Sequence, residues 1–205
     1  MKLYYAPGAC SLAAHIVADE ADVRLQLEKV DLKSHKTENG QDYYAINPKG
    51  YVPTIQLDDG STLTENVAVL NYMADRTGDK LYTPRPHTME HYRLEEWLGF
   101  ITTELHKSFA PFFTGGDEDE KRTAKEKILT RFKYVDEKLE DKQFLMGDRM
   151  TVADAYLFVM LTWARKNNIS IDRCSNLRAF FERMSHRDGV QRAMKEEGLQ
   201  LPLAA

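Results

Sequence analysis

The chain has 205 residues, enough for one large domain or two small ones that bury a core without disulfides. Its 28 Lys and Arg residues against 32 Asp and Glu residues leave a net charge of -4, which argues against a nucleic-acid-binding protein. Two cysteines are too few for a disulfide framework or a cysteine-based zinc site. The start has no signal-peptide pattern and no apolar run could span a membrane, so we expect a cytoplasmic protein with no membrane partner.

The first 80 residues alternate strand-like and helical patterns. Residues 23–28 alternate apolar and polar side chains, as a half-buried strand does, and the turn residues 58–61 indicate a hairpin. The predicted strands cover residues 2–5, 23–28, 53–57 and 62–63, and the predicted helices cover residues 11–20 and 65–76. This order predicts an open α/β layer, which we assign to a domain over residues 1–80.

The rest of the chain has a helical pattern. Pro84 and Pro86 indicate a linker over residues 81–87, because proline continues neither a helix nor a strand. An apolar stripe from Leu94 to Phe112 predicts one long helix. Further helical patterns cover residues 128–139, 152–163 and 177–184, and residues 115–120 read as a polar loop. We therefore expect an all-α domain over residues 88–205.

Cys10 is the first candidate for chemistry. It lies where a helix should begin, and a helix amino terminus stabilises a thiolate and lowers the thiol pKa. The alternative is that Cys10 is a small buried apolar side chain. Because residue 13 is alanine, no second thiol stands where a dithiol motif would need one. A redox reaction would therefore need an external thiol.

Two features of the first domain suggest ligand contacts. Thr64 could cap the predicted helix and Glu65 would complement its dipole, which is a common structural pattern. The same helix start also suits a zwitterionic amino-acid group, because unpaired N–H groups attract a carboxylate while Glu65 attracts an ammonium. Val52–Pro53 opens a strand, and most X–Pro bonds are trans.

A third feature lies on the long predicted helix. Leu105 belongs to the apolar stripe, so His106 points about 100° away from it. Thr103 is three residues from His106 and shares its face, with Lys107 close by. The alternative is an ordinary solvated helix face.

Two other patterns, the Thr151–Asp154 spacing and the remaining histidines, are not predicted to have a functional role. Thr151 and Asp154 have the spacing of a capping box before the buried helix, and we expect them to be structural. The histidines outside residue 106 show no spacing to acidic or sulfur ligands that we recognise, so we expect no metal. The ones considered are His15, His87, His91 and His186.

Taken together, the motifs resemble those of a known family. They are residues 2–5, 7–12 (Pro-Gly-Ala-Cys-Ser-Leu), 47–53, 57–60, 63–65, 104–107 and 151–158. In this order they make the chain similar to a bacterial beta-class glutathione S-transferase over nearly its whole length. The resemblance implies a thioredoxin-like domain that binds glutathione, an all-helical domain with the second-substrate pocket, and a homodimer.

The resemblance also implies roles for individual residues. The backbone of Val52 would pair with the cysteinyl part of glutathione, with Pro53 cis, and Cys10 and His106 would lie next to the glutathione sulfur. The γ-glutamyl end would be held by Glu65 and Asn66, and the neighbouring wall formed by Thr103, Glu104, Leu105 and Lys107. His35 stands where a lysine often meets the glycyl carboxylate, so this contact departs from the family pattern.

The expected function is an enzyme that conjugates reduced glutathione, as a co-substrate, to small hydrophobic electrophiles. The helix end and His106 would supply the field that stabilises the thiolate. Cys10 could also form a mixed disulfide with glutathione. Two alternatives remain open: a glutathione-dependent disulfide oxidoreductase or peroxidase, and a non-catalytic protein that binds ligands or regulates. The electrophile pocket could be lined by Phe109, Phe112, Phe113 and Trp163, or these side chains could be core.

Overall fold

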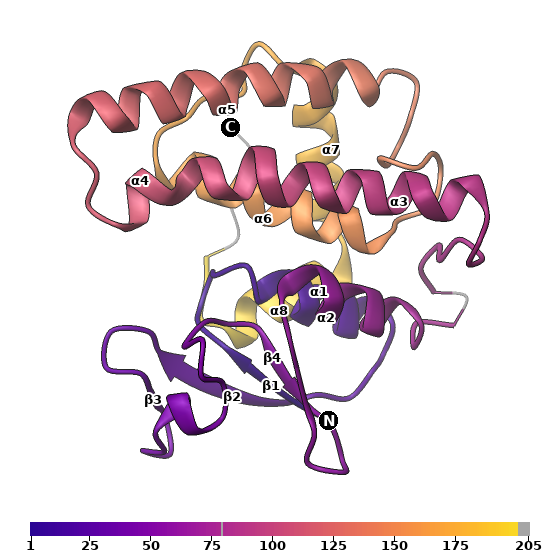
Figure 1. Ribbon diagram of the computed structural model, residues 1–205. Coiled ribbons are helices and arrows are strands. Elements are labelled where there is room, and N and C mark those ends of the chain that lie inside the picture. Colours follow the sequence, from indigo (N-terminus) through magenta and orange to yellow (C-terminus); the bar gives the residue numbers. More distant parts are fainter. Residues whose placement is uncertain (79, 201–205) are drawn as a thin grey trace. The chain divides into compact units, whose positions relative to one another are not determined.

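The chain folds as two units in the computed structural model, which describes residues 1–78 and 80–200 (Figure 1). Among the described residues, unit 1 comprises Met1–Leu81 together with residues 185–200, and unit 2 comprises Tyr82–Met184. Unit 1 contains the sheet and unit 2 is helical. The predicted fold class, an α/β domain joined to an all-helical one, is confirmed.

A mixed five-stranded sheet with the order β3-β2-β1-β4-β5 forms the base of unit 1. Its strands are β1 (Lys2–Tyr5), β2 (Gln26–Asp31), β3 (Lys36–Thr37), β4 (Thr54–Gln56) and β5 (Thr62–Thr64). The strands β1 and β2 are parallel, while β4 is antiparallel to both β1 and β5, which confirms the predicted hairpin. The strand predicted from residue 23 begins later, because the N–H of Val23 bonds to Ala18 and closes the preceding helix.

Three α-helices belong to unit 1: α1 (Leu12–Glu20), α2 (Asn66–Ala74) and α8 (Asp188–Glu196). A short 3-10 turn, η1 (Tyr43–Ala45), lies between β3 and β4. The core contains fully buried side chains from the sheet, α1 and α2, among them Leu3, Ile16 and Leu70.

The sequence analysis contained no prediction for α8, although its buried Val190, Ala193 and Met194 have helical spacing. In the structure, α8 packs along α1 (Figure 1). The stretch 88–205, expected to form one helical domain, thus includes a helix whose contacts lie in unit 1.

Unit 2 confirms most of the predicted helices. They are α3 (Met89–Phe100), α4 (Ala110–Phe113), α5 (Glu118–Lys138), α6 (Val152–Lys166) and α7 (Ser175–Ser185). Every residue of α6 up to Leu161 is buried, as predicted for a central helix. The helix α5 begins inside the predicted loop 115–120, because Asp117 and Glu120 form a capping box that starts it early. No helix in the described part of the chain is both long and apolar enough to cross a membrane.

The long helix predicted from Leu94 to Phe112 is not regular. After α3 it passes through a π-helical turn, η2 (Ile101–Leu105), and a 3-10 turn, η3 (His106–Phe109), before α4 begins. The hydroxyls of Thr102 and Thr103 donate to the main-chain carbonyls of Leu98 and Gly99, four residues earlier, at 2.8 and 3.0 Å. These side chains therefore provide hydrogen bonds to carbonyls at the point where the regular helix ends. Pro111 has no N–H, so regular α-helical bonding cannot continue through that position.

The predicted capping box of Thr151 and Asp154 before α6 is confirmed. The fully buried carboxylate of Asp154 accepts hydrogen bonds from the N–H and hydroxyl of Thr151, both at 2.8 Å. Its other oxygen accepts from the N–H of Leu145 at 2.8 Å. The group therefore ties the start of α6 to the preceding loop.

Candidate functional site

Cys10 lies in the turn between β1 and α1. The hydroxyl of Ser11 accepts a hydrogen bond from the N–H of Ala6 at 3.3 Å, and this bond holds the turn. The Cys10 side chain is buried, and its Sγ donates to the carbonyl oxygen of Val52 at 3.4 Å. The structure thus brings together two of the predicted site residues, Cys10 and Val52.

The segment that carries Val52 is held by a buried polar network. The hydroxyl of Tyr43 donates to the carbonyl of Tyr51 at 2.8 Å, and the amide of Asn47 donates to the same oxygen at 2.7 Å. Asn47 also bonds to Thr54 at 3.1 Å. The Val52–Pro53 peptide bond is cis, as the resemblance implied. Within the described residues, no hydrogen bond partner is seen for the Val52 N–H, so this backbone group is available to a ligand.

Glu65 and Asn66 stand at the start of α2. Glu65 has a positive φ of 72°, and its carboxylate accepts a hydrogen bond from Lys49 at 2.6 Å. Thr64 does not cap the helix as expected, because α2 begins at Asn66 and its N-cap residue is Glu65; the Thr64 hydroxyl accepts from the same Lys49 ammonium at 2.7 Å. The buried amide of Asn66 has neither its nitrogen nor its oxygen hydrogen-bonded to any described residue. An unpaired buried amide is costly, so Asn66 is poised for a polar ligand.

His35 is a partly buried polar side chain with one unused buried atom. Its ring lies against that of Tyr44, with 4.4 Å between the ring centroids. Gly50, with φ of 71°, lies beside both rings: a Cβ there would come within 2.7 Å of Tyr44 and 3.1 Å of His35. The Nδ1 atom of His35 is buried and has no hydrogen-bond partner within the described residues. His35 therefore also retains hydrogen-bonding capacity.

The predicted residues of unit 2 occupy the irregular stretch of helix described above. The carboxylate of Glu104 accepts from Arg131 of α5 at 2.8 Å, and Lys127 lies 3.8 Å away. Leu105 is fully buried, while Thr103 is exposed and donates to the carbonyl of Gly99. Lys107 is exposed. The π-helical turn carries Thr103 to Leu105, and such turns often occur at functional sites.

His106 lies in an aromatic surrounding. Its Nδ1 is 2.5 Å from the hydroxyl of Tyr156, and its ring meets that of Trp163 edge-on with centroids 4.9 Å apart. Burial, with a smaller contribution from the charge of Lys107, lowers the pKa of His106 to about 4. His106 is therefore neutral at pH 7, and it can act as a hydrogen-bonding group. Its role in stabilising a thiolate stays a prediction.

Tyr156 was missed in the sequence analysis. It stands in the segment predicted to be buried, and a buried tyrosine hydroxyl usually needs a partner. That requirement was the available signal, but it does not identify the partner. The aromatic residues predicted as a pocket do gather in unit 2, since the rings of Phe109 and Phe113 lie 5.5 and 4.7 Å from Trp163. Phe109 is fully buried and Phe113 is exposed, so the group extends from core to surface.

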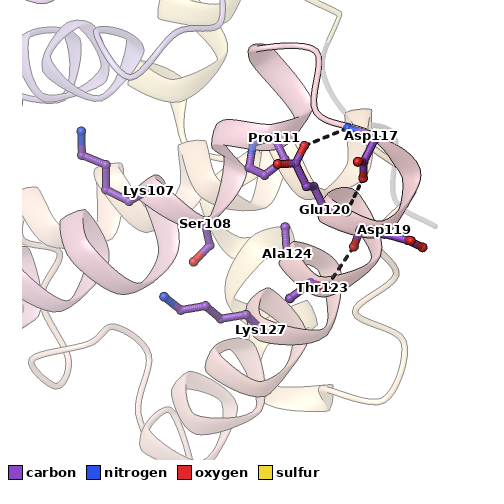
Figure 2. Close-up of a pocket in the computed structure, with 9 residues that line it drawn as sticks. All are labelled: Lys107, Ser108, Pro111, Asp117, Asp119, Glu120, Thr123, Ala124 and Lys127. Carbon is purple, nitrogen blue, oxygen red and sulfur yellow. Dashed lines mark hydrogen bonds between the residues drawn. The ribbon is translucent and has the colours of Figure 1, made fainter.

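A groove of about 480 Å³ lies between η3, α4 and the start of α5 (Figure 2). Figure 2 shows Lys107 and Ser108 on one side and the acidic residues of the α5 start on the other. Asp117 and Glu120 bond to each other's main chain there at 2.8 and 2.9 Å. Asp117 and Glu120 thus cap the start of α5. Of the residues predicted for the site, Lys107 lines this groove.

Comparisons with known proteins agree with this description. Residues 8–76 match a family model described as "Glutathione S-transferase, N-terminal domain", and residues 97–188 match "Glutathione S-transferase, C-terminal domain". Glutathione S-transferase GstA of Escherichia coli O157:H7 is 43% identical, and the match covers 98% of this chain and 100% of the relative.

Two solved structures extend the comparison. A bacterial beta-class glutathione S-transferase of Sphingomonas chungbukensis is 43% identical with a TM-score of 0.93, covering 98% of this chain and 100% of that one. A sphingomonad glutathione S-transferase complexed with glutathione is 38% identical with a TM-score of 0.92, again covering 98% and 100%. The similarity therefore extends over both units.

Proposed function

The chain belongs to the glutathione S-transferase family, and on this premise we propose that it binds glutathione in unit 1 and conjugates the whole tripeptide, through its thiol sulfur, to hydrophobic electrophiles. The observation that carries the proposal is the buried amide of Asn66, which has no hydrogen-bond partner within the described residues. An amide in this state favours a ligand with both donors and acceptors. The γ-glutamyl end of glutathione, with its ammonium and carboxylate, is such a ligand.

The other residues of unit 1 are assigned to the rest of the tripeptide. We assign the backbone of Val52, next to cis Pro53, to the cysteinyl part, because the Val52 N–H is unused by the described chain. Glu65 is assigned to the ligand ammonium, and its bond to Lys49 would hold the carboxylate in place. The open Nδ1 of His35 is assigned to the glycyl end.

Catalysis is assigned to Cys10 and His106, with Thr103, Glu104, Leu105 and Lys107 as further glutathione contacts. The reaction requires the tripeptide thiol to lose its proton, after which the thiolate attacks the electrophile. A neutral His106 stabilises the thiolate by donating from Nε2, provided that its Nδ1 accepts from Tyr156. The chemistry requires no metal. The aromatic rings around Trp163 suit an apolar second substrate.

Cys10 gives the protein a second activity, glutathione-dependent disulfide exchange. The Cys10 thiolate would attack a glutathione disulfide, forming a protein–glutathione disulfide and releasing one glutathione thiolate. We therefore expect Cys10→Ala to abolish exchange with hydroxyethyl disulfide but only to reduce conjugation to chlorodinitrobenzene. Loss of conjugation in this variant, with glutathione binding intact, would reject that division of roles.

The biological setting is also proposed. Two buried cysteines without a disulfide suit a reducing cytoplasm. We expect a homodimer with no nucleic-acid partner, and light scattering after size-exclusion chromatography measures the oligomeric state.

The binding proposal is tested by calorimetry with glutathione. Asn66→Ala should weaken binding about tenfold, or about 1.4 kcal/mol, because it removes hydrogen bonds made only to the ligand. Its stability to urea should change little. Asn71→Ala on the same helix is the matched control and should bind glutathione like the parent. Equal binding by parent and Asn66→Ala, or no binding by the parent, contradicts the proposal.

A further inference from the structure

A cluster of metal-ligating side chains lies between α1 and α8, outside the residues assigned to glutathione. His15 of α1 is almost completely buried, and its Nε2 lies 3.0 Å from a carboxylate oxygen of Glu196 in α8. The same nitrogen lies 3.8 Å from Oδ2 of Asp19, one helical turn along α1. Figure 1 shows α8 beside α1, and all of these residues belong to unit 1. Asp19 follows His15 by four residues, but Glu196 comes from a distant helix, so the sequence alone does not bring the three side chains together.

The spacing of the three ligand atoms fits a small tetrahedral centre. One ligand atom from each residue lies within 4.8 Å of the other two. Zinc binds imidazole nitrogen and carboxylate oxygen at about 2.0–2.2 Å, so tetrahedral ligand atoms lie roughly 3.3 Å apart. The observed separations from Nε2, 3.0 and 3.8 Å, bracket this value. Small side-chain movements would equalise them.

The second nitrogen of His15 has the partner that a metal-bound histidine usually has. Its Nδ1 lies 3.1 Å from a carboxylate oxygen of Glu197, whose side chain is fully buried. The other Glu197 oxygen accepts the N–H of Gly8 at 2.8 Å, so the carboxylate is fixed on both sides. A carboxylate that accepts from one ring nitrogen directs the lone pair of the other toward a metal.

The balance of charge in the cluster favours a cation. Three carboxylates, those of Asp19, Glu196 and Glu197, face one imidazole. The Oδ2 atom of Asp19 is buried and accepts no hydrogen bond from any described residue. Arg192, which donates to the main-chain oxygen of Asp19, is a nearby cation that offsets part of this negative charge.

We propose that His15, Asp19 and Glu196 bind one divalent metal ion of the zinc type, with Glu197 orienting the imidazole and water completing the coordination. Two carboxylates and one imidazole suit zinc or cobalt. Glu196 is half exposed, so an ion can reach the site from solvent. Bound metal would fasten α8 to α1. The argument for this site uses none of the residues assigned to glutathione, although Glu197 also contacts Gly8 of the Cys10 turn.

The test uses Co²⁺ as a spectroscopic probe on the full chain, stripped with a chelator and carrying Cys10→Ser to remove a competing thiolate. We expect one equivalent of Co²⁺ to bind with the strong visible absorption of tetrahedral coordination. Asp19→Asn and Glu196→Gln, which keep side-chain volume, should each weaken binding at least about tenfold. The matched control is Glu95→Gln, which removes the acid four residues after His91 and should bind like the parent.

Two results overturn the proposal. One is Co²⁺ binding with the same affinity and spectrum in the parent, Asp19→Asn and Glu196→Gln. The other is the absence of stoichiometric binding by the parent at micromolar to millimolar Co²⁺, in which case a proton on His15 suffices to balance the carboxylates. Circular dichroism of each variant checks that it is folded, and neither readout depends on transferase activity.

Discussion

Two histidines, the buried His15 of unit 1 and the partly buried His106 of unit 2, have opposite electrostatic surroundings. His15 in unit 1 contacts carboxylates, which raise its pKa, while His106 in unit 2 contacts aromatic rings and has a lowered pKa of about 4. Both side chains are largely removed from water, so burial alone does not explain the difference. What differs is whether opposite charge compensates the lost hydration of the charged ring. Near pH 6.5, one imidazole is therefore mainly a cation and the other a neutral hydrogen-bonding group.

The largest expected effect comes from replacing each ring with leucine. His15→Leu leaves the buried Glu197 carboxylate without its cationic partner, and we expect a loss of about 3 kcal/mol or more in the free energy of unfolding. His106→Leu removes the hydrogen bond to Tyr156 and should cost about 1 kcal/mol. Urea denaturation in chelator at pH 6 measures both, with the exposed His186→Gln as control. Equal losses for the two leucine variants would remove the contrast between the sites.

The pH dependence of stability is the next largest effect. The folded pKa of His106 lies below its ordinary value of 6.5, so the unfolded chain binds the proton first and stability falls as the pH drops from about 6.5 toward 4. The shift corresponds to about 3 kcal/mol. The difference between the parent and His106→Leu across this range isolates the contribution, because the carboxyl groups titrate in both proteins. A constant difference between pH 6.5 and 4 would contradict a buried neutral imidazole.

His15 should behave in the opposite sense. Its folded pKa is raised, so its stabilising contribution is complete below pH 6.5 and is lost as the pH rises through the folded value. The groups that set this behaviour are Asp19, Glu196 and Glu197. The histidine C2 proton resonances in an NMR titration assign each pKa directly.

The smallest expected effect is that of Glu196, the most exposed of the three acidic residues around His15. Glu196 is about half exposed, so in metal-free buffer we expect Glu196→Gln to change the free energy of unfolding by less than about 1 kcal/mol. The pKa of His15 should fall slightly but stay above that of His106. Urea denaturation with the same NMR titration measures both quantities. A loss as large as that of His15→Leu would place the stabilising charge on Glu196 instead of Glu197.

Much of the fold could be predicted because its signals are local. The alternation in the sheet strands, the apolar stripes and the Thr151–Asp154 capping box each depend on residues a few positions apart. The predictions failed where long-range contacts or main-chain hydrogen bonding determine where a helix or strand begins and ends. The helix predicted from Leu94 to Phe112 is irregular where Pro111 and the hydroxyls of Thr102 and Thr103 change the main-chain bonding. Residue 23 is not in a strand, because its N–H bonds to Ala18 at the end of α1.

The candidate site divides in the same way. Candidate residue types such as Cys10 and Glu65 could be proposed from the sequence, and the family resemblance supplied their roles. The charge state of His106 could not be predicted, because it depends mainly on burial, and the rings of Tyr156 and Trp163 that lie against it come from another helix. The acidic partners of His15 on α8 likewise lie about 180 residues away along the chain.

The packing of α8 on α1 has a consequence for how the protein is made. The ribosome completes α1 and the sheet long before it adds residues 188–196, so the nascent first domain exposes an unfinished helix surface while the second domain is synthesised. His15 gains its α8 carboxylate partners only after that late segment emerges. Glu197, which holds the Cys10 turn through the N–H of Gly8, likewise becomes available only after that segment has been made.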